Sequence, residues 1–295
     1  MAKQHRILTG QVAAITGAAR GIGRATAEAF LREGMKVAIG DLDFATAQQT
    51  AAELGHGTIA LPVNVTERAS VKAFLDAAEE QLGPIDVLVN NAGIMQVGHR
   101  IWEEDDATTQ RMIDINVNGV MYGVKEIVPR MLERGRGHVV NIASTAGKGG
   151  FPGGGTYCGT KHYVVGLSEA LRAELRDTGI EVSCVMPVVV NTELAAGLQQ
   201  TRGVKQVQPS DVADEIVSAL KEARFDVFVP RSVASITKVM NLLPRGGREA
   251  LSHALKADQV LAHVDAGQRA AYELRANRSD PTLEAGDEPA KQLTP

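Results

Sequence analysis

The stretch Val12-Ala-Ala-Ile-Thr-Gly-Ala-Ala-Arg-Gly-Ile-Gly23 joins a short apolar run to three closely spaced glycines. Beyond it, Ala25, Ala29 and Phe30 recur at helical spacing, so the pattern predicts a strand, a glycine turn and a helix in that order. Such glycines let backbone N–H groups approach a pyrophosphate at the N-terminus of the helix. A tight turn without a ligand is the alternative explanation for the glycines taken alone.

A second predicted strand supports the nucleotide interpretation. The run Lys36-Val-Ala-Ile-Gly40 ends at Asp41, eighteen residues beyond Gly23. In a dinucleotide-binding unit, an acidic residue at this place accepts hydrogen bonds from the adenosine ribose. The first 41 residues therefore predict a nucleotide-binding unit.

Strand-like segments alternate with helical stretches along most of the chain. This alternation predicts an α/β fold, a single Rossmann-type doubly wound parallel sheet with helices on both faces, followed by a helical C-terminal extension. Ligands of such sheets bind at the carboxyl ends of the strands. The expected strands lie near residues 11–16, 36–40, 57–63, 85–90, 138–143, 180–186 and 225–229.

Composition narrows the function classes. The 295 residues are 44% hydrophobic and carry a net charge of -4, which fits one substantial core and gives no reason to expect a nucleic-acid partner. The first residues lack the apolar core of a secretory signal, and no long apolar run is present, so we expect a soluble, cytoplasmic protein. Cys158 and Cys184 have no cluster of His or Cys at metal-ligand spacing, so we expect no metal site.

Tyr157 and Lys161 stand four residues apart in a predicted helix, thirteen and seventeen residues after Ser144. At this spacing two side chains share one helix face, about 5–6 Å apart at Cβ. A neighbouring ammonium at an effective dielectric near 20 stabilises a phenolate by about 4 kcal/mol, enough to move a phenol pKa from about 10 toward 7. The pair is thus a candidate proton-transfer device, with a lowered tyrosine pKa as the expectation.

Further motifs follow other predicted strands: Asn90-Asn-Ala-Gly93, Asn116 in Ile-Asn-Val-Asn-Gly, and the run Pro187-Val-Val-Val-Asn-Thr192. With the glycine spacing Gly-x-x-x-Gly-x-Gly and the Tyr-x-x-x-Lys pair, the chain resembles the short-chain dehydrogenase/reductase family from about residue 8 to 230. The resemblance implies an oxidoreductase that transfers a hydride between a nicotinamide cofactor and an alcohol or ketone.

The resemblance implies a role for each of four residues. Tyr157 would be the general acid/base, and Ser144 would hydrogen-bond the reacting oxygen. Lys161 would lower the pKa of Tyr157 and hold the nicotinamide ribose, and Asn116 would connect Lys161 to solvent through its backbone carbonyl. Each residue also has a purely structural alternative, such as capping a turn, bracing a helix, packing or facing solvent.

Asp41 decides the expected cofactor. Its carboxylate can accept a hydrogen bond from a ribose hydroxyl and would repel a 2′-phosphate, so NAD is the expected cofactor. Arg20 could pair with that phosphate, so NADP is the alternative. The resemblance implies contacts to the cofactor from Gly17, Arg20, Gly21, Ile22, Gly23, Asp41, Leu42, Asn64, Val65, Asn91, Ala92, Gly93, Tyr157, Lys161, Pro187, Val190 and Thr192.

One position departs from the family pattern. Val188 stands where the family commonly has glycine after the proline. A β-branched residue disfavours a positive φ, so we expect this loop to take an extended path. The added side chain would also narrow the substrate pocket.

Apolar side chains dominate the expected substrate side, and no arginine or lysine cluster there suggests a grip on phosphate or carboxylate. The candidate substrate residues are Ser144, Met95, Phe151, Val188 and Tyr157. A neutral hydrophobic secondary alcohol or ketone, such as a sterol, retinoid or lipid-like molecule, is the expected substrate. An NADPH-dependent carbonyl reductase is the alternative enzyme, and a non-catalytic nucleotide sensor with a dehydrogenase fold is the alternative class.

The chain divides into an expected dehydrogenase domain over residues 1–230, a helical extension over 231–276 and a disordered tail over 277–295. Apolar residues at helical spacing predict one helix over Ser232–Leu243 and another around Ala254–Arg275. We expect the extension to pack near the substrate site or on a second subunit, with contact to a membrane surface as the less favoured alternative. The resemblance implies a homodimer or homotetramer.

Overall fold

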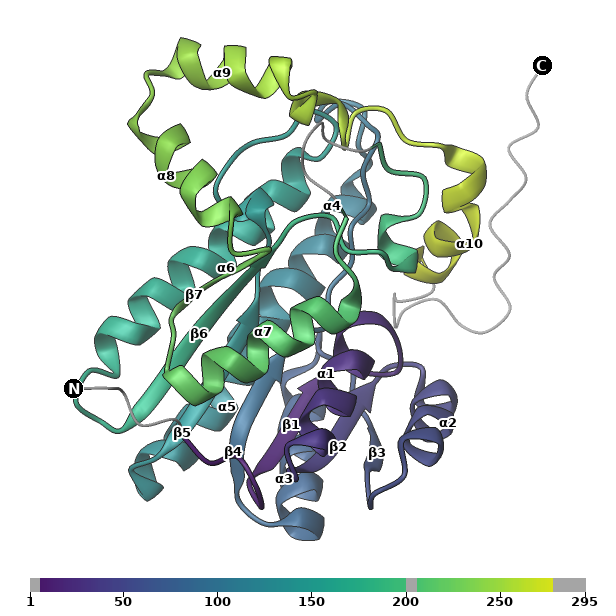
Figure 1. Cartoon of the computed structure of the whole chain (residues 1–295). Coiled ribbons are helices and arrows are strands. Elements are labelled where there is room, and N and C mark those ends of the chain that lie inside the picture. The colour runs from purple at the N-terminus through teal and green to yellow at the C-terminus, as the bar shows by residue number, and fades with distance from the viewer. Residues whose placement is uncertain (1–5, 200–205, 278–295) are drawn as a thin grey trace.

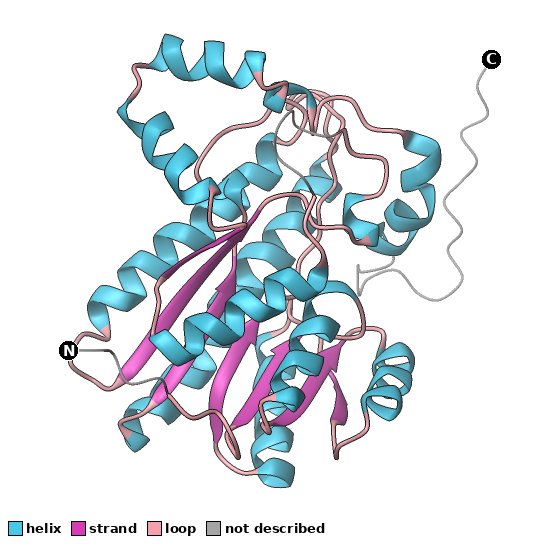
Figure 2. Ribbon diagram, in the orientation of Figure 1, coloured by secondary structure: helices cyan, strands magenta, loops and turns pink. Residues whose placement is uncertain are grey.

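A computed structural model of the chain describes residues 6–199 and 206–277. Seven strands form one parallel sheet in the order β3-β2-β1-β4-β5-β6-β7, visible as the magenta arrows of Figure 2. The doubly wound parallel sheet predicted from the sequence is confirmed, and the ends of the predicted strands differ from the observed ones by at most two residues. The strands are β1 (Val12–Thr16), β2 (Lys36–Asp41), β3 (Ile59–Pro62), β4 (Ile85–Asn90), β5 (Gly137–Ile142), β6 (Ile180–Pro187) and β7 (Asp226–Val229).

Helices cover both faces of the sheet (Figure 1). Side chains alternate across a strand, so Ala13 and Ile15 of β1 enter one core, and Val12 and Ala14 enter the other. Both faces must therefore be apolar, which explains why the strands are nearly continuous hydrophobic runs. The first face carries α1 (Gly21–Arg32), α2 (Phe44–Leu54) and α7 (Pro209–Glu222), and the second carries α3 (Arg68–Leu82), α5 (Gly119–Arg134) and α6 (Gly155–Glu174).

The strand order reverses at β1, which pairs with β2 on one side and β4 on the other. Chain connections leave this point in opposite directions and open a crevice beyond the carboxyl ends of the two strands. The glycine turn follows β1 and the Asn91–Gly93 segment follows β4, so both motifs meet at this crevice.

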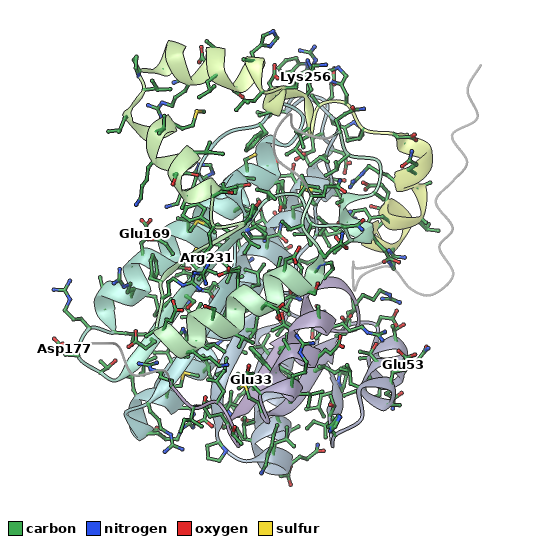
Figure 3. The ribbon with its side chains drawn as sticks, in the orientation of Figure 1. Glu33, Glu53, Glu169, Asp177, Arg231 and Lys256 are labelled. Atoms are coloured by element: carbon green, nitrogen blue, oxygen red, sulfur yellow. The ribbon has the colours of Figure 1, made fainter. Side chains whose placement is uncertain are left out.

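The C-terminal part contains α8 (Val233–Leu242), α9 (Arg245–Ala254), a short 3-10 turn (Ala257–Gln259) and α10 (Ala266–Asn277). In Figure 1, α8 and α9 stand out from the body above the carboxyl ends of the strands. Figure 3 labels Arg231, which lies just before α8, and Lys256, which lies just after α9. Leu242 of α8 is 86% exposed and Val239 is 54% exposed, so these apolar side chains contact little of the body.

The predicted helix over Ser232–Leu243 is confirmed as α8, but the one around Ala254–Arg275 is wrong in extent. The chain breaks after α9, and α10 begins only at Ala266, where the Asp265 carboxylate accepts a hydrogen bond from the Gln268 N–H. The helix α9 was not predicted, because Gly246 and Gly247 in its first turn disfavour a helix.

The tail expected over residues 277–295 lies outside the described residues apart from Asn277, which ends α10. No helix within residues 6–199 and 206–277 is both long and apolar enough to cross a bilayer.

His138 is a buried polar group in the middle of the sheet. The Ser183 hydroxyl donates to the Arg224 carbonyl at 2.6 Å, so the imidazole Nε2, 2.8 Å from the Ser183 oxygen, is the donor between these two side chains. Burial lowers the pKa of His138 to about 3, and the charge of Arg6 adds to this effect. The imidazole is therefore neutral in the folded protein across ordinary pH.

This burial predicts a loss of stability in acid. Between pH 6.5 and about 3 the unfolded chain binds a proton at His138 that the folded protein does not, so stability falls as the pH falls. The slope is about 1.4 kcal/mol per pH unit, or about 2 kcal/mol on reaching pH 5. Urea unfolding at pH 7 and pH 5 should show this extra loss in the wild type relative to His138→Gln. Equal acid losses in the two proteins would contradict it.

Candidate active site

The glycine turn between β1 and α1 is shaped by very close backbone contacts. Gly17 has φ +64°, and a Cβ there would lie 2.7 Å from the Ala92 Cα. A Cβ at Gly23 would lie 2.6 Å from the Gly17 carbonyl oxygen. Neither position accepts a side chain, so the glycines are required by the turn itself. The result is an open helix N-terminus at the crevice, with no side chain between it and a ligand.

Asn91 fastens this turn to the end of β4. Its side-chain amide donates to the carbonyl oxygens of Thr16 and Gly17, both at 2.8 Å. In return, the Thr16 hydroxyl accepts hydrogen bonds from the N–H groups of Asn91 and Ala92. The Asn91 amide is therefore occupied in holding the two sides of the crevice together.

Asp41 lies at the end of β2 on the other side of the glycine turn. Its carboxylate accepts hydrogen bonds from the Ala19 N–H at 2.9 Å and the Asp43 N–H at 3.0 Å. Burial raises the pKa of Asp41, while these hydrogen bonds oppose the shift. Each oxygen accepts one backbone bond and keeps a further lone pair.

Arg20 is engaged by its own neighbours. Its guanidinium donates to Asp43 at 2.7 Å and to the Thr46 hydroxyl at 2.8 Å. Partial burial favours the neutral form of Asp43, but the hydrogen bonds from Arg20 and Thr46 outweigh it and lower the pKa of Asp43. The positive charge of Arg20 is thus already balanced beside Asp41.

Ser144, Tyr157 and Lys161 converge above β5. Ser144 lies two residues after the end of β5, and its hydroxyl accepts a hydrogen bond from the Ala146 N–H at 3.1 Å. Its side chain also hydrogen-bonds Tyr157, which with Lys161 lies on the buried side of α6. The Lys161 Nζ lies 5.8 Å from the centre of the Tyr157 ring and donates to the Ile142 carbonyl at 2.9 Å.

The expected acidification of Tyr157 by Lys161 is wrong for the protein's own groups. Burial raises the pKa of Tyr157 to about 12, and the Ser144 hydrogen bond only partly offsets this. Burial likewise lowers the pKa of Lys161 to about 8. Both shifts have the same cause: each group has lost most of its contact with water, which disfavours the phenolate of Tyr157 and the ammonium of Lys161.

Asn116 lies beside this group in a π-helical turn, Asp114–Asn118, between α4 (Asp106–Ile113) and α5. Its side chain accepts from the Ile94 N–H and donates to the Ile94 carbonyl and the Thr160 hydroxyl. The side chain is therefore saturated by structural bonds. A π turn interrupts the regular i→i−4 ladder of backbone hydrogen bonds, and such turns often occur at functional sites.

One cleft of about 1720 Å³ brings nearly all the predicted site residues together. It is lined by every predicted cofactor and substrate residue except Gly23, which lies under the turn, and Asn116 is buried behind it. Two of the lining residues, Leu42 and Asn64, have different surroundings. Leu42 is 47% exposed at the rim, and the Asn64 side chain is occupied by Thr66 and Glu67.

At the substrate end, Met95, Phe151 and Val188 line the cleft as predicted. Val188 avoids the left-handed region, as expected, and its N–H donates to the Val229 carbonyl. Sequence reasoning missed the cleft residues contributed after residue 256, notably Leu261 and Tyr272. Their neighbours in the sequence carry no motif, so only the fold could reveal them. No group of three His, Cys, Asp or Glu side chains in the described ranges could hold a metal ion.

Comparison with known proteins agrees with this geometry. The profile of the short chain dehydrogenase family matches residues 11–203. The chain belongs to the short-chain dehydrogenase family. It is accordingly an oxidoreductase that acts on CH–OH groups, and the predicted family is confirmed.

Similar proteins span several substrate types. A sorbitol dehydrogenase from Cereibacter sphaeroides is 40% identical over 63% of this chain and 73% of its own length. The 3beta-hydroxysteroid dehydrogenase 2 from Eggerthella lenta is 36% identical over 68% of this chain and 78% of its own. The chain is also 36% identical to a glycine betaine reductase from Emericella nidulans over 73% of this chain, but spans only 18% of that protein.

Among solved structures, a short chain dehydrogenase/reductase from Burkholderia phymatum in complex with NAD is 31% identical and aligns with a TM-score of 0.74. The alignment covers 80% of this chain and 94% of that one.

The close contact at Gly23 predicts the effect of a single methyl group. Gly23→Ala should force the turn apart, lower the melting temperature and weaken dinucleotide binding at least tenfold, because the added Cβ meets backbone atoms. The matched control is Gly166→Ala in α6, where a Cβ meets nothing within 4 Å and should stabilise the helix by about 0.5–1 kcal/mol. Isothermal titration calorimetry and thermal unfolding measure both effects. Unchanged dinucleotide affinity in Gly23→Ala would refute the assigned role of the turn.

Proposed function

We propose that the protein interconverts a hydrophobic secondary alcohol and its ketone with NAD(H), using Tyr157 as the general acid/base. The observation that carries this proposal is the convergence of Ser144, Tyr157 and Lys161 on the same cleft as the glycine turn and Asp41. Bound NAD would supply or accept the hydride, and the chain's own residues would hold the substrate oxygen and move its proton.

The protonation states favour a defined division of labour. With a pKa raised to about 12, Tyr157 carries its proton at neutral pH, which is the form that donates to a carbonyl oxygen during reduction. The Ser144 hydroxyl would hold that oxygen and stabilise the charge developing on it. For the reverse reaction Tyr157 must first lose its proton, which the burial that raises its pKa opposes and the hydrogen bond with Ser144 favours.

Lys161 and Asn116 would complete the proton path. Lys161 is 6% exposed, so it needs a protein route to exchange its proton with solvent. The π turn around Asn116 alters the regular backbone hydrogen bonding close to Lys161. This supports the Asn116 backbone carbonyl as the next group after Lys161 in the proton-transfer path.

Asp41 supports NAD over NADP. A phosphate on the ribose would face a buried carboxylate, and the cation that could offset this, Arg20, is already paired with Asp43. The same residues would hold the adenosine end, with the glycine turn beneath the pyrophosphate. The related structure in complex with NAD is consistent with this assignment.

The apolar substrate end supports a hydrophobic alcohol or ketone. Met95, Phe151 and Val188 all line the cleft, which suits an apolar ring or chain. The relative named as a 3beta-hydroxysteroid dehydrogenase agrees with this class, whereas the relative named as a sorbitol dehydrogenase indicates a polar substrate. A screen of sterols, retinoids and polyols as substrates separates the two.

Replacing the phenol tests the chemistry. Tyr157→Phe should lower turnover at least a thousandfold while NAD affinity stays within about twofold, because the ring still packs but no proton can move. Absorbance of the reduced nicotinamide measures turnover, and calorimetry measures binding. Activity close to that of the wild type would remove Tyr157 from the mechanism.

Replacing the acid tests the cofactor. Asp41→Ala should raise kcat/KM with NADP, because the carboxylate no longer repels the 2′-phosphate. It should lower kcat/KM with NAD, because the hydrogen-bond acceptor for the ribose hydroxyl is lost. Steady-state assays with both cofactors measure the ratio. A wild type that turns over NADP at least as well as NAD would support the NADPH-dependent carbonyl reductase instead.

A further inference from the structure

Arg269 of α10 is buried far from the glycine turn and carries an unusual set of partners. Its side chain is 2% exposed. The guanidinium donates to the Met95 carbonyl at 2.7 Å and to the Leu194 and Ala196 carbonyls, both at 3.1 Å. Its charge is balanced by Glu273 one turn along the same helix, at 2.8 Å. One side chain thus binds three backbone oxygens from two separate parts of the chain.

Both of these parts contribute residues to the proposed substrate end of the cleft. Met95 lies two residues after Gly93, in the segment that follows β4. Leu194 and Ala196 follow Thr192 in the loop after β6. Met95 and Leu194 both line the cleft, whereas Arg269 does not, so the buried guanidinium joins the two lining segments behind the surface of the cleft.

Neighbouring groups on α10 strengthen the same connection. The Tyr272 hydroxyl accepts a hydrogen bond from the Met95 N–H at 2.7 Å, so both polar atoms of Met95's backbone are held by α10. Gln96 donates to Glu273 and to Asn277. In the segment after β6, the Gly197 carbonyl accepts a hydrogen bond from the Asp265 N–H at 2.9 Å.

A buried guanidinium is well suited to this task. Its planar fork offers five donors in fixed directions, which lets it hold several carbonyls at a set separation. Without it, the three carbonyls lose their charged donor in a buried place, which is costly enough for the loops to move until water reaches them.

We propose that Arg269 is a positioning residue that sets the width of the substrate pocket by fixing residues 94–97 against residues 192–197. This inference rests on the proposed function for its substrate class, a hydrophobic alcohol or ketone. The adenosine end of the cleft, at Asp41, depends on other elements, and Arg269 bonds to Leu194 and Ala196, beyond the expected cofactor contact Thr192. We therefore expect Arg269 to act mainly on substrate affinity and much less on nucleotide affinity.

The test compares Arg269→Met and Arg269→Lys with a matched control, Arg130→Met. Arg130 of α5 pairs with two acids, Asp76 and Glu79, its side chain is 18% exposed, and none of the three residues lines the cleft. For the best sterol or retinoid of the screen, Arg269→Met should raise KM at least tenfold while kcat and the NAD dissociation constant change less than about threefold. Arg269→Lys should restore part of the affinity, and Arg130→Met should lower the melting temperature without raising KM.

Hydrogen exchange gives a readout that needs no turnover. Peptides covering 94–97 and 192–197 should exchange faster in both Arg269 variants and not in Arg130→Met. If neither peptide changes, or if KM stays constant while only α10 exchanges faster, Arg269 merely fastens its own helix and the proposal is overturned. A wild type that reduces and oxidises none of the tested substrates would instead refute the proposed function, and the exchange result would still decide the role of Arg269.

Discussion

The whole site depends on how closely the backbone at Gly17 approaches the backbone at Ala92. The two segments follow neighbouring strands at the point where the sheet reverses its order, and no side chain fits between them. Asn91 and Thr16 close the gap with four hydrogen bonds, so the contact is fixed from both sides. Because this contact sets where α1 begins and where the chain leaves β4, it also places everything that follows those two elements.

The parallel sheet and the positions of its strands could be predicted from the sequence because most strands are short apolar runs that alternate with helical stretches, whereas the order of the strands came only from the structure. The proposed catalytic group was likewise accessible, since Tyr157 and Lys161 share a helix face by spacing alone. Those inferences use local periodicity, and the distances involved are set by one element or by two adjacent strands.

The parts that could not be read depend on tertiary environment. The pKa of Tyr157 is set by how much water burial removes and by the opposing hydrogen bond with Ser144, and neither follows from a four-residue spacing. The non-helical stretch between α9 and α10 ends where the Asp265 carboxylate accepts a hydrogen bond from the Gln268 N–H and so caps α10. The helix α10 in turn packs against segments that are distant in the sequence. Arg269 lies in a stretch without glycine motifs, and its partners are 73 to 174 residues away in the chain.

That separation has a consequence for the order in which the protein is completed during synthesis. The glycine turn, Asp41 and the Asn91 bonds all form within the first 92 residues, whereas the Met95 carbonyl waits for a guanidinium 174 residues later. Contacts between such distant residues close late, because the intervening chain must be ordered first. During synthesis the chain therefore contains the glycine turn, Asp41 and Asn91 well before it contains the arginine that joins the two segments at the other end of the cleft.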